Sequence, residues 1–144
     1  MGFLALVLHL LGASIWVGGH LILLFTVLPS ALVLRDPLIL LNFEKRYERI
    51  GVPALLLQVI TGIWMAHRYV PGILPAFDFG DRLQSLIAWK LILLLMMVLI
   101  GAHARFRIIP RLTQERLPFM ALHVLAVTIL SVVLLILGAS VRWA

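Results

Sequence analysis

Cysteine is absent from this chain of 144 residues, and charged residues are scarce. Without cysteine, the chain cannot form disulfides, use thiol catalysis, bind zinc or iron–sulfur clusters through cysteine, or attach a c-type haem covalently. Charged residues make up 12% of the chain and hydrophobic residues 63%, whereas a soluble domain carries about 25% charge and about half apolar residues. The composition therefore excludes a soluble globular enzyme and a disordered chain, and it indicates a membrane protein.

Acidic residues are the scarcer of the two charged kinds, and the net charge is +6. In a membrane protein, such a basic surplus usually lies at the ends of the spans and indicates topology. The chain has no array of basic and aromatic residues typical of proteins that read nucleic acids. We therefore expect the lipid membrane as a partner, and no nucleic acid.

Four apolar runs predict membrane-spanning helices, each of which needs about 20 residues. They predict an all-α integral membrane protein, a single domain over residues 1–144 folded as an antiparallel bundle of four transmembrane helices. We expect the helices at about residues 3–34, 50–68, 83–109 and 117–141. The charged stretch 42–49 alternates in sign, which is typical of a solvated helical extension of the second span.

Lys and Arg residues divide unequally between the two sides of this bundle. Eight lie on the side of the connections between spans 1 and 2 and between spans 3 and 4, and four lie on the other side. The positive-inside rule makes the side with eight cytoplasmic. We therefore predict a multi-pass protein of the bacterial inner (cytoplasmic) membrane with both termini in the periplasm. The eight are Arg35, Lys45, Arg46, Arg49, Arg105, Arg107, Arg111 and Arg116, and the four are Arg68, Arg82, Lys90 and Arg142.

Five histidines lie within or at the ends of the apolar spans, where an ionisable side chain is costly and marks a functional site by default. Their expected depths give an outer layer, His9 and His67, and an inner layer, His20, His103 and His123. His9 and His20 are eleven residues apart, so they share one helix face and stand about 16 Å apart along the axis. Two imidazoles at two depths are typical of a b-type cytochrome that stacks two haems across a membrane.

The histidine pattern thus predicts a membrane oxidoreductase or electron carrier that binds one or two haem b groups through pairs of histidines. With two haems both layers ligate iron, whereas with one haem the other layer binds substrate or relays protons. Quinone or a small reductant is the expected redox partner. Arginines at the span ends are candidates for pairing with haem propionates. They are Arg68, beside His67, and Arg105 and Arg107, beside His103.

Lys90, in the outer half of the third span, is a candidate catalytic residue or a charge partner for an anionic substrate. The alternative is a side chain that extends toward the outer interface. Gln58 and Thr61 share a face of the second span and are expected to form hydrogen bonds between helices.

Copper is the alternative ligand, because imidazole and thioether groups both suit it. Met65 lies close to His67, and Met120 close to His123, at helical spacing. This alternative predicts a copper transport protein, and a further alternative is an accessory subunit of a larger membrane complex or a homo-oligomer. The candidate metal ligands are His9, His67, His103 and His123.

Short motifs along most of the chain resemble a known family. The first span, with His9, the segment Trp16–Gly19 and Leu28-Pro29, resembles the first helix of the CopD-type copper-resistance membrane proteins and of their relatives, the HemJ-type protoporphyrinogen oxidases. The segment 43–53 followed by Thr61-Gly62 resembles the link into the second helix of the HemJ type. The segment 89–93 resembles the start of the third HemJ helix.

The resemblance implies a small four-helix membrane protein. The HemJ type binds haem b and oxidises protoporphyrinogen, with a quinone as the expected electron acceptor. The CopD type is associated with copper movement across the inner membrane. The residues that the resemblance assigns to the site are His9, Trp16, Lys90 and His103.

Two positions depart from the HemJ pattern. Ser30 follows Pro29, where the HemJ type usually has an arginine. The fourth span carries His123, whereas the fourth HemJ helix typically opens with an Asn-Glu-x-Pro-like segment. These departures favour a CopD-like relative.

Overall fold

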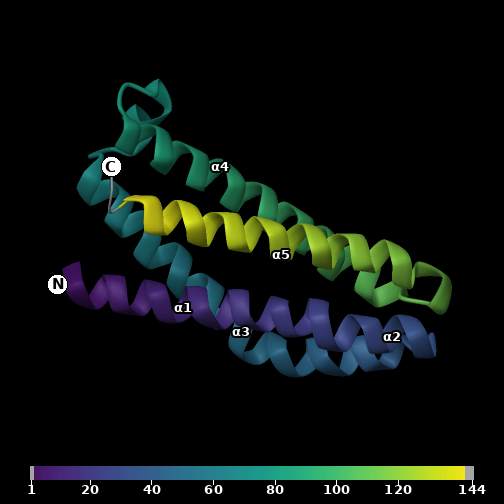
Figure 1. Cartoon of the computed structure of the whole chain (residues 1–144). Coiled ribbons are helices and arrows are strands. Elements are labelled where there is room, and N and C mark those ends of the chain that lie inside the picture. The colour runs from purple at the N-terminus through teal and green to yellow at the C-terminus, as the bar shows by residue number, and fades with distance from the viewer. Residues whose placement is uncertain (1, 142–144) are drawn as a thin grey trace.

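The computed structural model describes residues 2–141, and within them the long elements are all helices (Figure 1). Four helical segments are long and apolar enough to cross a membrane: Gly2–Leu34, Pro37–Tyr69, Arg82–Arg111 and Gln114–Ser140. The prediction of an all-helical, multi-pass integral membrane protein with four spans is confirmed. Arg142, counted above on the outer side, lies outside the described residues.

The first segment consists of α1 (Gly2–Ile22), a π-helical turn (Leu23–Val27) and α2 (Leu28–Leu34). The wide turn directly precedes Pro29, which has no N–H to continue the α-helical ladder. Here the N–H of Leu28 donates to the carbonyl of Leu23, one residue further back than in an α-helix. The proline therefore accounts for the irregular backbone in the first span.

The second segment is α3 (Pro37–Tyr69). It begins well before Ile50, where the sequence predicted that the apolar span begins. Asp36 caps it by accepting a hydrogen bond of 2.9 Å from the N–H of Leu38, and Pro37 suits the first turn. The apolar run marks only the part of the helix long enough to cross the bilayer, and the helix continues past it at its N-terminal end. The charged stretch 42–49 is helical, as predicted.

The third segment again has an aspartate cap at its start and a π-helical turn before a proline. α4 (Arg82–His103) is capped by Asp81, and a π-helical turn (Ala104–Ile108) follows it before Pro110. α5 (Leu117–Ser140) follows after a short connection. A 3₁₀ helix, Leu74–Asp78, lies in the connection between α3 and α4.

The helices alternate in direction, so Gly2 and Val141 lie at the same end as the α3–α4 connection (Figure 1). α1 packs mainly on α3 and α4 mainly on α5, and α1 also contacts α5. We call the end with Gly2 and Val141 the terminal end, and the end with the α2–α3 and α4–α5 connections the connection end.

The two ends of the bundle are packed differently. At the connection end, nine buried apolar residues form a continuous core. Toward the terminal end, a partly open cavity of about 260 Å³ lies between α1, α3, α4 and α5. A second, smaller cluster of buried apolar residues also lies at the terminal end: Ala66, Val70, Ala76, Ile87 and Ala88. The nine core residues are Leu23, Leu28, Ala31, Leu40, Ala104, Ile108, Leu117, Met120 and Val124.

Candidate functional site

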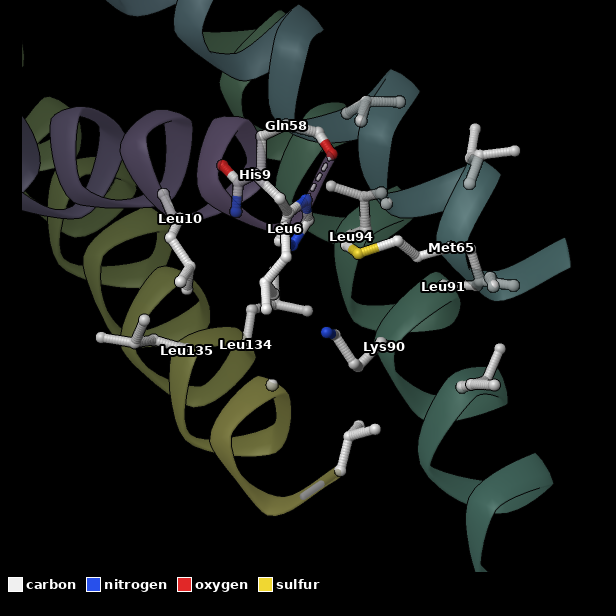
Figure 2. A pocket seen from close by; sticks show the side chains of 18 of the residues that line it. Leu6, His9, Leu10, Gln58, Met65, Lys90, Leu91, Leu94, Leu134 and Leu135 are labelled. Atoms are coloured by element: carbon white, nitrogen blue, oxygen red, sulfur yellow. Dashed lines mark hydrogen bonds between the residues drawn. The ribbon is translucent and has the colours of Figure 1, made fainter. Parts of the chain in front are cut away.

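The cavity at the terminal end gathers polar side chains from three helices. His9 of α1, Gln58 of α3 and Lys90 of α4 line it among apolar side chains, and Met65 adds a thioether. Figure 2 shows His9 and Lys90 pointing into the same space from different helices. The buried Oε1 of Gln58 has no hydrogen-bond partner among the described residues. The cavity thus contains polar groups whose hydrogen bonding is incomplete.

His9 is held in one orientation by α3. Its Nδ1 lies 2.8 Å from the carbonyl oxygen of Gln58 and 3.2 Å from Oγ1 of Thr61. The Thr61 hydroxyl donates to the carbonyl of Leu57 at 2.6 Å, so Nδ1 is assigned as the N–H donor to Gln58. The Nε2 of a neutral His9 then carries the free lone pair. Gly62 makes room for this ring, because a Cβ there would stand 2.9 Å from Cε1 of His9.

Lys90 extends into the bundle. Its Nζ lies 3.3 Å from the position that a Cβ would take on Gly138 of α5. The sequence left two alternatives for this lysine, and the structure has it pointing into the cavity (Figure 2). None of the six Asp and Glu side chains lines the cavity, so within residues 2–141 the ammonium has no acidic side chain as a partner there.

His20 lies in the middle of the bundle and is 9% exposed. Its Nδ1 is 2.8 Å from the carbonyl oxygen of Trp16, and its ring centroid lies 4.4 Å from that of Trp16 and 5.8 Å from that of Tyr47 on α3. His9 also contacts α3, so the prediction that His9 and His20 share one face of the first span is confirmed. Within residues 2–141, no hydrogen bond joins His20 to another histidine.

Trp16, which the resemblance assigned to the site, packs on His20 and reaches across to α5. Its indole N–H donates to Oγ of Ser131 at 3.0 Å. Oγ of Ser131 in turn lies 3.3 Å from the sulfur of Met97. The indole N–H thus has a hydrogen-bond partner inside the bundle.

Tyr47 is a central residue that the sequence did not single out. Its hydroxyl donates toward the carbonyl oxygens of Ile15, at 3.1 Å, and Trp16, at 3.2 Å. One signal in the sequence points to it: Tyr47 lies four residues before Gly51 on the same helix face, where glycine leaves room for a ring. A Cβ on Gly51 would stand 2.7 Å from the Tyr47 ring.

His103 and His123 form a pair where α4 meets α5 near the connection end. Nδ1 of His103 lies 3.0 Å from Nε2 of His123, and Nδ1 of His123 lies 3.0 Å from the carbonyl oxygen of Phe119. His123 is therefore assigned to donate its N–H to Phe119 and to accept from His103. The π-helical turn Ala104–Ile108 begins directly after His103, and such turns are frequent at functional sites.

His67 lies apart from the other histidines, at the C-terminal end of α3. Its Nδ1 accepts a hydrogen bond of 3.2 Å from the N–H of Gly72. It does not line the cavity that holds His9. The structure therefore brings together two of the three inner histidines, His103 and His123, but it does not unite the outer pair in one cavity.

The three candidate arginines have different surroundings. Arg68 lies over the ring of Trp64, with 5.4 Å between its guanidinium carbon and the ring centroid. Arg105 forms an ion pair of 2.7 Å with Glu48 of α3. Arg107 lines a depression next to His103, together with Arg111, Glu115 and Arg116 among others.

The methionines take different roles. Met120, which the sequence paired with His123, is 4% exposed and belongs to the core of the connection end. Met65 lines the cavity with His9. Within residues 2–141, no group of three or more His, Cys, Asp or Glu side chains is placed to hold a metal ion. A metal site in this part of the chain would therefore be built on two imidazoles.

The separation within the His103–His123 pair is that of a hydrogen bond between the two rings. Nδ1 of His103 and Nε2 of His123 are 3.0 Å apart, and the stacked rings have centroids 5.1 Å apart. A metal ion bound by both nitrogens would replace this hydrogen bond. The cavity that His9 lines, of about 260 Å³, is small beside the roughly 300–1,000 Å³ of pockets for drug-sized ligands.

The protein-family model of copper resistance protein D, CopD, matches residues 41–143. The match includes α3, α4 and α5, with Lys90 and the His103–His123 pair, and it leaves His9 and His20 of α1 outside. Searches of curated proteins and of solved structures found no match. The resemblance to the CopD type is confirmed over most of the chain, whereas the resemblance to the HemJ type stays a prediction. The chain belongs to the copper resistance protein D family of membrane proteins.

Proposed function

We propose that this protein handles copper in the inner membrane and that His103 and His123 bind the ion, as cargo, at the connection end. The observation that carries this proposal is the 3.0 Å separation between Nδ1 of His103 and Nε2 of His123. Two ring nitrogens at this distance can bind one ion once the rings move apart by about 1 Å, to the roughly 4 Å between two opposed ligands with bonds of about 2 Å. Family membership supports copper as that ion.

The hydrogen bonds of the pair prepare it for a metal. Donation from His123 Nδ1 to the carbonyl of Phe119 leaves Nε2 with its lone pair. Metal-ligating histidines almost always donate their other N–H in this way. The exposed ring of His103 can hold its proton on Nε2 instead, which frees Nδ1 as the second ligand. Copper binding would then replace the hydrogen bond between the two rings.

A pair of imidazoles favours copper over zinc. Structural zinc sites take four protein ligands, and catalytic ones take three. No third His, Cys, Asp or Glu joins the pair in residues 2–141. Site geometry and metal supply, and not affinity alone, decide which metal such a site holds. A site with only two protein ligands suits an ion that is passed on to another site, rather than an ion that is held permanently.

The positive-inside rule places the pair on the cytoplasmic side. The connection end carries Lys45, Arg46 and Arg107 among its eight basic residues. The terminal end, with both termini and the α3–α4 connection, then faces the periplasm. The proposed copper site therefore lies on the inner side of the membrane, and the terminal end, with its cavity, lies on the opposite side.

The experiment is a competition titration with a chromophoric Cu⁺ chelator, on full-length protein in lipid nanodiscs. We expect one Cu⁺ per chain, and at least tenfold weaker binding in His103→Ala and in His123→Ala. His67→Ala is the matched control, because His67 lies at the end of another helix. Unchanged affinity in both variants, or equal losses in all three, would remove the pair as the copper site.

The second candidate is the haem b protein predicted from the histidine pattern. One observation favours it: His9 donates Nδ1–H to a backbone carbonyl and leaves Nε2 free toward the cavity. Haem would need a wider cavity and a second ligand from elsewhere in the chain. A pyridine haemochrome assay on purified protein tests this, and stoichiometric haem that is lost in His9→Ala would favour it over the copper proposal.

A further inference from the structure

We infer that the cavity beside Lys90 binds an apolar molecule that carries a single carboxylate and enters from the lipid phase. This inference concerns the terminal end of the bundle and does not depend on the copper site.

The charge in the cavity is positive and unbalanced. Among the described residues that line it, Lys90 is the only Lys, Arg, Asp or Glu. The six Asp and Glu side chains lie elsewhere, so no side-chain carboxylate balances the ammonium inside the cavity. A charge in a low-dielectric site is costly unless it is paired. An anionic ligand would supply the missing partner.

The position of Lys90 argues against a metal ion in the same space. His9 and Met65, which both line the cavity, would otherwise suggest a soft metal site. The ammonium of Lys90 points toward His9 in the cavity (Figure 2), and it would repel a second cation. Gly138 leaves room for the ammonium, because a Cβ there would stand 3.3 Å from Nζ. The geometry therefore favours an anion beside Lys90.

Apart from Lys90, His9, Gln58 and the phenol of Tyr69, the lining is apolar, and this favours a hydrocarbon body for the ligand. Leucine, isoleucine, valine and alanine side chains from all four helices surround the polar groups. The amide of Gln58, whose Oε1 has no partner, is a further polar group in this lining. A ligand with one carboxylate and a hydrocarbon body would match this division between one charged point and apolar walls.

The cavity also reaches the surface that faces lipid. Leu6 and Leu10 of α1 and Leu135 of α5 line it and are 44%, 49% and 43% exposed. Figure 2 shows Leu10 and Leu135 on the side where α1 and α5 approach each other. In a bilayer these side chains meet acyl chains, so a membrane-dissolved ligand can reach Lys90 without crossing water.

The test uses decanoate labelled with ¹³C at its carboxyl carbon, added to full-length protein in nanodiscs of phosphatidylcholine. We expect a saturable resonance, distinct from that of decanoate in the bilayer. Lys90→Gln should weaken its binding at least tenfold. Lys45→Gln is the matched control, because Lys45 is an exposed lysine outside the cavity.

A second variant covers the case in which Lys90→Gln fails to fold. Gly138→Val fills the space in front of Nζ and should also weaken binding. Thermal unfolding reports whether each variant is intact. Binding that survives both variants would overturn the inference, as would equal competition by decanol, which has no charge. Phospholipid that co-purifies in a Lys90-dependent manner, detected by native mass spectrometry, would also overturn it.

Discussion

The phenol ring of Tyr47 occupies the space above Gly19 into which a Cβ would project. Tyr47 belongs to α3 and Gly19 to α1, and the Tyr47 hydroxyl bonds to carbonyl oxygens on α1. His20, the next residue along α1, meets the same ring edge to face. The two helices therefore close around one aromatic side chain, and the absence of a side chain at Gly19 permits the contact.

Gly19→Ala should destabilise the protein, because its methyl group would overlap the Tyr47 ring. Overpacking of this kind costs about 1–3 kcal/mol. Thermal unfolding in detergent measures the effect. Gly18→Ala is the control, because a Cβ at Gly18 meets nothing within 4 Å. Equal unfolding temperatures for the two variants would contradict the packing described for Tyr47.

The ion pair between Arg105 and Glu48 should contribute little to stability. Its side chains are 44% and 35% exposed, and such pairs typically contribute about 0.2–1 kcal/mol. A double-mutant cycle with Arg105→Gln and Glu48→Gln should therefore give a coupling energy within that range. A coupling well above it would mean that the pair lies in a drier environment than the exposure indicates.

The orientation of the bundle can be tested with introduced cysteines, because the chain has none of its own. Thr113, in the α4–α5 connection, and Leu74, in the α3–α4 connection, are both exposed. A membrane-impermeant maleimide added to intact cells should label Leu74→Cys, whereas Thr113→Cys should react only after the membrane is opened. The opposite result would place the His103–His123 pair on the outer side.

The fold follows from the sequence more directly than the site does. Apolar length alone predicts four spans, because a bilayer requires that length of any helix. It does not predict where a helix begins, since α3 begins after its N-terminal cap, Asp36, and runs through a charged stretch before it reaches the apolar run. Helical periodicity correctly places His9 and His20 on one face, because that relation is internal to one helix.

The partners of the histidines could not be predicted with the same success, because they depend on how helices pack. Depth alone suggested that His9 and His67 form a pair, but His67 bonds to the turn that follows α3. Depth also grouped His20 with His103 and His123, whereas His20 packs against Trp16 and Tyr47. Helix rotation and the path of the backbone after a helix end decide these contacts, and neither is visible in residue spacing.

The copper proposal is tested most directly by X-ray absorption at the copper K edge, on Cu⁺-loaded protein with one ion per chain. We predict two imidazole nitrogens at about 2 Å from the copper, and one imidazole fewer in both His103→Ala and His123→Ala. His67→Ala should leave the spectrum unchanged. A first shell of sulfur without imidazole, or a spectrum that neither His103→Ala nor His123→Ala alters, would contradict the assignment of this pair as the copper site.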